Sequence, residues 1–252
     1  MTSTHTFAPS DFDFKSARLD LSQKLQVSIA NMIALLQIGV AVILGLGIAR
    51  EFLIGYVGAG TVLQDLRHFA LDAERSIPAW LEGTTMAASS LLLLLIAAVS
   101  GKFDTRNQIQ WAALAAIFLL MSIDESVSFH EILVAPLRNT FNLSGVFYFS
   151  WVLVATPVVI ALGLYFTPFL FRLPAQTAIR IIIAGTVFVG GALGTEFVCG
   201  YLATTAGMET LAYRTTAATQ ECLETIGMTL FFTALLRHLA LIAPSLRLAI
   251  NN

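Results

Sequence analysis

Ionisable side chains stand inside or at the ends of several long apolar stretches of this sequence. The densest group is Ser122-Ile-Asp-Glu-Ser-Val-Ser-Phe-His-Glu131, and other stretches contain Glu82, Glu196, Glu221 and Glu224. A carboxylate at membrane depth needs a proton, a hydrogen-bond donor, a cation or a water-filled cavity, because an unrelieved charge there is costly. These residues are therefore the first candidates for a functional site.

Helical spacing predicts how these groups face. Since the predicted third span runs to residue 133, Asp124, Ser128 and Glu131 share one stripe, at about 100° per residue. That stripe should face the interior of the bundle rather than lipid. Glu221 and Glu224, three residues apart, share a face of a later helix. Two carboxylates so close repel if both are ionised, so we expect a shared proton or a bridging cation.

The donor types favour a hard metal ion. Carboxylate oxygens with at most one or two imidazoles suit Fe, Mn, Mg or Ca better than structural zinc, which prefers Cys and His. We expect a divalent or trivalent metal ion, with Fe or Mn favoured over Zn, and catalytic roles for His130 and Asp124. The predicted metal ligands are Glu82, Glu125, His130, Glu131, Glu196, Glu221 and Glu224.

Each assignment has a structural alternative. Glu82 is alternatively a first-turn acid that complements a helix dipole. Glu196, Glu221 and Glu224 are alternatively hydrogen-bonded carboxyls without a ligand. A lone histidine is commonly a satisfied structural donor, although the acidic neighbours of His130 favour ligation or proton transfer. The sequence lacks the Glu-x-x-His units of di-iron bundles, so we do not assign a di-iron centre.

The composition places these residues in a membrane protein. Of 252 residues, 57% are hydrophobic and 12% charged, whereas a soluble domain has about 25% charged residues. The mean hydropathy is +0.79. A formal net charge of -2 without a Lys/Arg-rich run excludes a nucleic-acid partner. The lipid bilayer is the expected environment.

The expected fold is an all-α, polytopic membrane bundle. Each span needs about 20 apolar residues, which gives a cytoplasmic tail or interfacial segment (1–26), a six-helix domain (27–243) and a short C-terminal tail (244–252). In the loop from Gly58 to Pro78, Thr61 and Gln64 are spaced like a capping box, which predicts a short interfacial helix. This helix is either a lid over the acidic residues, which would bring in His68, or a structural surface helix. The predicted spans are roughly 27–55, 79–100, 108–133, 146–171, 178–203 and 217–243.

The distribution of positive charge favours cytoplasmic termini. With both termini inside, nine of the 14 Lys and Arg residues lie on the inner side and five on the outer side. The acidic residues then share the outer third of the bundle. We expect a multi-pass protein of the bacterial inner (plasma) membrane. The inner residues are Lys15, Arg18, Lys24, Lys102, Arg106, Arg172, Arg180, Arg237 and Arg247.

Small residues and cysteines add packing predictions. Small residues stand at close-packing intervals in the first span, at Ala41, Gly45 and Ala49, and in the fifth, at Gly190 and Gly194. These faces should contact another helix, within the bundle rather than in a dimer. Cys199 and Cys222 lack CxxC spacing and are interpreted as small buried residues, with a disulfide only if their helices are neighbours.

The third-span segment, with its apolar run, Ser-x-Asp-Glu and then His-Glu, resembles a group of uncharacterised bacterial six-span membrane proteins. The later Glu-x-x-Glu followed by Gly-Met is similar too. The resemblance covers about two spans. It implies no activity, since that group has none assigned, and supports treating the acidic residues of both segments as one set.

Three functions fit these residues. The first is a metal-dependent membrane enzyme acting on a lipid-soluble small molecule at the outer face. The second is an accessory subunit of a larger membrane complex, in which the carboxyls are hydrogen-bonded fasteners. The third is a proton- or cation-coupled transporter, although the inner halves of the spans offer almost no ionisable residues. The substrate and oligomeric state do not follow from the sequence.

Overall fold

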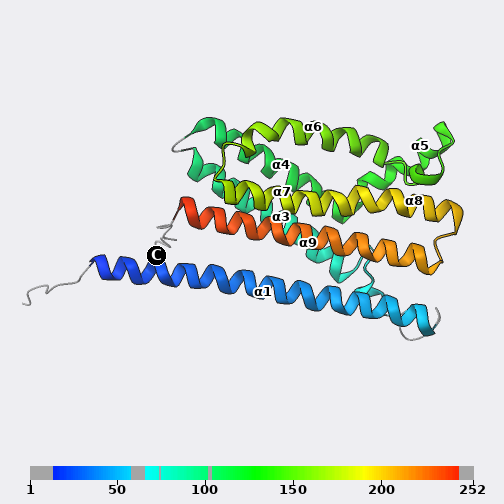
Figure 1. Cartoon of the computed structure of the whole chain (residues 1–252), viewed down its shortest axis with the longest axis horizontal. Helices are drawn as coiled ribbons and strands as arrows, with labels where there is room; N and C mark the ends of the chain where they lie inside the picture. The colour runs from blue at the N-terminus through cyan, green and yellow to red at the C-terminus, as the bar shows by residue number, and fades with distance from the viewer. Residues whose placement is uncertain (1–13, 58–65, 74, 102–103, 244–252) are drawn as a thin grey trace, which may run out of the picture.

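The computed structural model describes residues 14–57, 66–73, 75–101 and 104–243, which form helices and no strands. Six of these helical segments are long and apolar enough to cross a membrane, so the predicted all-α polytopic fold is confirmed (Figure 1). The long helices are α1 (Phe14–Val57), α3 (Ile77–Ser100), α4 (Thr105–Val127), α6 (Val152–Leu170), α7 (Ala175–Val189) and α9 (Leu211–Ile242).

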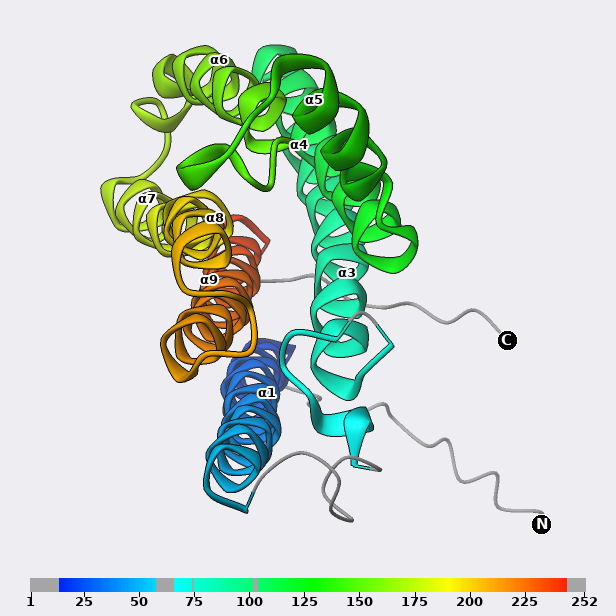
Figure 2. The same cartoon turned by 90° about the vertical axis from the view of Figure 1, so that its right-hand side faces the viewer.

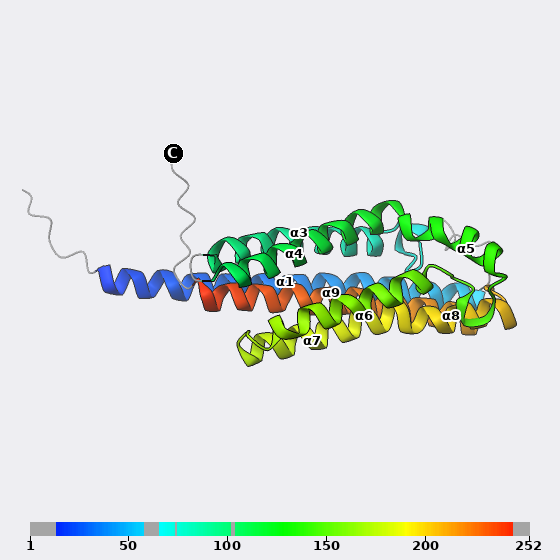
Figure 3. The same ribbon diagram turned by 90° about the horizontal axis from the view of Figure 1, so that it is seen from above.

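The shorter elements connect or extend these helices. A π-helical segment, η4 (Gly190–Thr195), joins α7 to α8 (Glu196–Thr205), and together they form one span of residues 175–205. Three 3-10 turns are η1 (Arg67–Phe69), η2 (Phe129–Leu133) and η3 (Gly145–Phe147), and α5 is Val134–Phe141. The long helices run side by side along the long axis (Figure 3). We call the end where α3, α6 and α9 begin and α4 and α8 end the cavity end.

Helix α9 packs against α1, α3 and α7, and the view onto the cavity end shows it between α7 and α1 (Figure 2). Glycines allow the close approach of α7 and α9. A Cβ on Gly227 would lie 2.6 Å from the backbone nitrogen of Phe188, and one on Gly191 would lie 2.9 Å from Cβ of Leu223. The predicted contact residues Gly190 and Gly194 have open space instead, because the π-helical segment changes which face meets α9.

Helices α3 and α4 form an antiparallel pair joined by hydroxyl groups. Ser90 donates to the carbonyl of Ala115 at 2.7 Å, and Ser122 donates to the carbonyl of Gly83 at 2.8 Å. Such bonds between helices are effective where few other donors are present. They hold the end of α4 beside the start of α3.

A hydrophobic core fills the bundle away from the cavity end. Leu93, Ile96, Trp111, Phe169 and Leu235 are its most deeply buried large members. They come from the end of α3, the start of α4, and the ends of α6 and α9. The half of the bundle opposite the acidic residues is therefore closely packed and apolar.

Three local predictions need correction or completion. The helix α1 begins at Phe14, so half of the predicted tail is helical, whereas residues 1–13 and 244–252 lie outside the described residues. The predicted interfacial helix lies partly outside them too, and its described part is the 3-10 turn η1. The expected helix contact at Gly45 is wrong, because α1 turns Val40 and Leu44 inward and leaves Gly45 in open space.

Candidate functional site

The third span ends earlier than predicted, and this brings His130 onto Asp124. Helix α4 stops at Val127, and Ser128 takes a left-handed conformation with φ 55° that ends the α-helical winding before η2. The stripe predicted for Asp124, Ser128 and Glu131 is therefore wrong, since Glu131 is not on that helix. The Asp124 carboxylate instead accepts the backbone N–H of His130 at 3.0 Å and lies 2.8 Å from its Nδ1.

This arrangement orients the imidazole ring. An ionised Asp124 only accepts hydrogen bonds, so Nδ1 then carries the hydrogen and Nε2 keeps its lone pair. The ring of Trp151 lies against His130, with the ring centroids 4.9 Å apart. A histidine fixed by a carboxylate in this way is suited to proton transfer or to ligation through its other nitrogen.

Glu196 lies near His130, directly after the π-helical segment. Its Oε1 accepts a hydrogen bond from Nε1 of Trp151 at 2.8 Å, and the amide of Gln220 bonds its carboxyl as well. His130 and Glu131 are its electrostatic neighbours. One indole thus contacts both the imidazole and a carboxylate, which links α6, η2 and α8.

A second set of carboxyls joins α3, α4 and α9. Glu82 is 2% exposed and its Oε2 accepts from the Thr225 hydroxyl at 3.0 Å, whereas its Oε1 is buried without a hydrogen-bond partner among the described residues. The electrostatic neighbours of Glu82 are Glu224 and Glu125, and those of Glu221 include Glu224, Glu82 and Glu125. Gln220 bonds Glu224 as well as Glu196, so it connects the two sets.

These side chains surround a cavity of about 670 Å³. We call its acidic lining residues the acidic wall: Asp72, Asp124, Glu125, Glu131, Glu196, Glu221 and Glu224. We call six of its hydrophobic lining residues the apolar wall: Ile117, Leu120, Val158, Leu162, Phe188 and Val189. Leu71 and Asp72 of the loop after η1 line the cavity, whereas His68 is exposed and does not.

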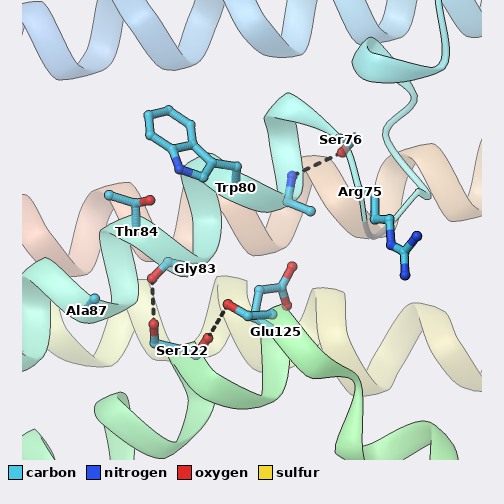
Figure 4. A pocket seen from close by; sticks show the side chains of 10 residues that line it. Arg75, Ser76, Trp80, Gly83, Thr84, Ala87, Ser122 and Glu125 are labelled. Atoms are coloured by element: carbon cyan, nitrogen blue, oxygen red, sulfur yellow. Dashed lines mark hydrogen bonds between the residues drawn. The ribbon is translucent and has the colours of Figure 1, made fainter.

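A smaller cavity of about 590 Å³ lies on the α3–α4 pair (Figure 4). Its lining includes Arg75, Ser76, Trp80 and Glu125. Glu125 lines both cavities, and a Cβ on Gly83 would lie 3.4 Å from its Cγ. The absence of a side chain at Gly83 therefore leaves room for Glu125 between the two helices.

The side chains are spread along the walls rather than gathered at a point. Within residues 14–57, 66–73, 75–101 and 104–243, no three His, Cys, Asp or Glu side chains form a group that could hold a metal ion. The predicted metal ligands thus share a region without a coordination geometry. Cys199 and Cys222 are both free, and Cys199 donates weakly to Gln220.

Five polar or aromatic residues of this region were not predicted from the sequence: Asp72, Trp151, Tyr213, Gln220 and Thr225. Gln220 directly precedes Glu221, and this adjacency was a usable signal. Trp151 and Thr225 gave none, because an aromatic or hydroxyl residue in a membrane helix is ordinarily a packing residue. Their roles follow only from the way the helices meet.

The fold and this region fit a multi-pass integral membrane protein with an acidic cavity near one end. Residues 32–239 match the model of a family described as Domain of unknown function (DUF8692), and the chain belongs to that family. The match agrees with the resemblance to an uncharacterised group, while the bacterial origin stays a prediction. No curated protein and no solved structure matches the chain significantly.

Proposed function

We propose that this protein is an integral-membrane enzyme that carries out proton-transfer chemistry on a lipid-soluble molecule held in the cavity. The observation that carries the proposal is the Asp124–His130 contact of 2.8 Å in the wall of a cavity of about 670 Å³. A cavity of roughly 300–1,000 Å³ is typical of small-molecule sites. Its walls contain both polar and apolar residues, which suits an amphipathic ligand.

In this proposal His130 exchanges a proton with the bound molecule through Nε2. Asp124 holds the ring by Nδ1 and stabilises the imidazolium that forms when Nε2 takes a proton. Trp151 packs against the ring and keeps Glu196 in place near it. The acidic wall supplies further groups that can donate or accept the proton.

The apolar core supports an enzyme over a carrier. A carrier needs a path that opens to both faces, and Trp111, Phe169 and Leu235 pack across the half of the bundle opposite the cavity. The cavity therefore serves molecules that arrive at one face or from the lipid. Under the predicted orientation, that face is the outer one.

Metal dependence remains a separate prediction from the donor types. Carboxylate and imidazole groups suit Fe or Mn, but the observed spread of these groups does not fit a bound ion, so we assign no step to a metal. Elemental analysis of purified protein decides this point. Stoichiometric Fe or Mn that is lost in Glu221→Ala and Glu131→Ala would support a metal enzyme, and its absence from active protein would exclude one.

Turnover of membrane lipids by the isolated protein tests the proposal. Purified protein in nanodiscs made from bacterial lipid extract is incubated, and mass spectrometry follows species that are consumed or formed. His130→Gln should slow the conversion by about 10²–10⁴-fold, and Asp124→Asn should also slow it. His68→Gln is the matched control, because His68 is exposed at the same end and outside the cavity.

Conversion by the single chain would also argue against an accessory subunit. No converted species, or equal conversion by the wild type, His130→Gln and Asp124→Asn, would overturn the proposed function.

A further inference from the structure

We infer that the cavity binds cationic amphiphiles, that is, molecules with a protonated amine head and a hydrocarbon chain. The inference rests on the proposed function, because it names the substrate class of the same site. It follows from the charge of one wall, a buried unpartnered oxygen, and the exposure of the other wall.

The charge of the cavity selects a cation. The acidic wall has seven carboxyl groups, and no Lys or Arg occurs among the described residues that line the cavity. Its one imidazole belongs to His130, which Asp124 already engages. In surroundings of low dielectric, opposite charges attract strongly, so a positively charged head stabilises the ionised form of these carboxyl groups and is favoured over a neutral or anionic head.

A buried oxygen without a donor points to the same ligand chemistry. Oε1 of Glu82 has no hydrogen-bond partner among the described residues, although Glu82 is only 2% exposed. Glu82 does not itself line the cavity, but it lies behind the acidic wall and interacts electrostatically with Glu224 and Glu125, which both line it. An ammonium group has three N–H donors and no acceptor, so it matches a lining in which the carboxyl acceptors outnumber the donors of Trp151, Tyr213 and Gln220.

The spread of the carboxyls favours an organic cation over a metal ion. A metal needs several oxygens at about 2.0–2.6 Å from one point, and the described acidic side chains form no such group. A volume of about 670 Å³ also far exceeds the needs of a single ion. A molecule that extends across the cavity can contact the separated carboxyl groups and fill this volume.

The apolar wall provides the place and the entrance for a hydrocarbon chain. Leu120 of α4 and Val158 of α6 both line the cavity, yet they are 66% and 50% exposed. In a membrane, exposed apolar positions on the spans face lipid. The cavity thus reaches the lipid between α4 and α6, which pack against each other sparsely, and an amphiphile can enter with its chain still in the bilayer.

Equilibrium binding of a long-chain amine tests the inference. Protein in phosphatidylcholine nanodiscs is titrated with radiolabelled dodecylamine, and with 1-dodecanol and dodecanoate as neutral and anionic probes of equal length. Protein-free nanodiscs correct for partitioning into lipid. Dodecylamine should bind saturably and at least about tenfold more tightly than either other probe, because only its head forms charge-assisted hydrogen bonds.

Variants of the acidic wall provide the second part of the binding test. Glu221→Gln and Glu224→Gln should each weaken dodecylamine binding by about tenfold and leave dodecanol binding unchanged, which shows that the cavity is still folded. Glu209→Gln, an exposed acid at the same end, is the matched control and should bind like the wild type. Equal affinity for all three probes, or amine binding that is insensitive to Glu221→Gln and Glu224→Gln, overturns the inference.

The outcome is independent of catalysis. His130→Gln should still bind dodecylamine, so binding without turnover would reject the proposed enzyme and retain the ligand class. Turnover of a neutral or anionic lipid would support the proposed enzyme and reject cationic amphiphiles as its substrate class.

Discussion

Asp124 connects the local fold to the chemistry of single side chains. Its two carboxylate oxygens contact the backbone N–H and the ring nitrogen of the same residue, His130. The residue that closes the turn after α4 therefore also sets the direction of the imidazole. A change at Asp124 should therefore disturb both the turn and the ring, whereas Trp151 contacts the ring from outside the turn.

The role of the Trp151 indole can be tested by substitution. Trp151→Phe keeps an aromatic ring and removes the donor to Glu196, whose carboxyl is then less well satisfied. We expect the free energy of unfolding to fall by about 1–3 kcal/mol, which lowers the melting temperature by about 2–4 °C per kcal/mol in a chain of this size. Thermal unfolding in detergent, followed by circular dichroism, measures the change.

Trp80→Phe is the control for this substitution, because Trp80 is 66% exposed. Its melting temperature should stay within about 1 °C of the wild type, as for most exposed positions. Equal losses in both variants would contradict the role given to the indole of Trp151.

Among the elements, the six spans and most of their ends were predictable, whereas the end of the third span and the starts of the fourth and sixth differ from the prediction by six residues. A span is predicted from the hydropathy of about 20 residues together, so one atypical residue does not change the prediction. Phe129, Ile132 and Leu133 continue the apolar pattern past Ser128, and nothing in that pattern reveals a left-handed residue there. The Asp124–His130 contact depends on that turn. The types of the two residues were therefore enough to predict that each is functional, but not that they contact each other. The Trp151–Glu196 bond depends likewise on helix register.

The close contact between α7 and α9 can be tested by a substitution at Gly227. In Gly227→Ala, the new Cβ would meet the backbone of Phe188 at 2.6 Å, and backbone does not rotate away, so the two helices must separate. Overpacking of this kind costs about 1–3 kcal/mol. We expect a lower melting temperature, measured as for Trp151.

Gly185→Ala, in α7, is the matched control, because a Cβ there meets nothing within 4 Å. It should be neutral or stabilising by up to about 1 kcal/mol, from the higher helix propensity of alanine. The interpretation of the α7–α9 contact is wrong if the two glycine variants melt alike.

The whole molecule has two unlike ends, and its orientation in the membrane is a prediction that labelling can test. Arg172 follows α6 at the end opposite the cavity, whereas Glu209 lies between α8 and α9 at the cavity end, and both are exposed. In a background of Cys199→Ala and Cys222→Ala, Glu209→Cys should react with a membrane-impermeant maleimide on intact cells. Arg172→Cys should react only after permeabilisation. The reverse pattern would invert the predicted topology.

The closely packed apolar half leads to a second prediction for the molecule as a whole. Proteoliposomes with an imposed pH gradient should dissipate it no faster than protein-free vesicles, as a pH-sensitive dye trapped inside would report. Accelerated dissipation that is lost in Glu221→Gln would instead favour the proton-coupled transporter.

The π-helical segment Gly190–Thr195 makes the length of its span as important as its composition. An i→i+5 turn accommodates one residue more than an α-helical turn, so the residues that follow are rotated relative to a regular continuation of α7. Deleting one residue from the segment would restore regular winding and leave Glu196 near its present orientation, whereas deleting one residue from the regular part of α7 would swing Glu196 by about 100°, away from the indole that donates to it. A conservative substitution at Glu196 alters one functional group, whereas a single-residue deletion in the regular part of α7 turns that whole group, and the rest of α8, away from the cavity.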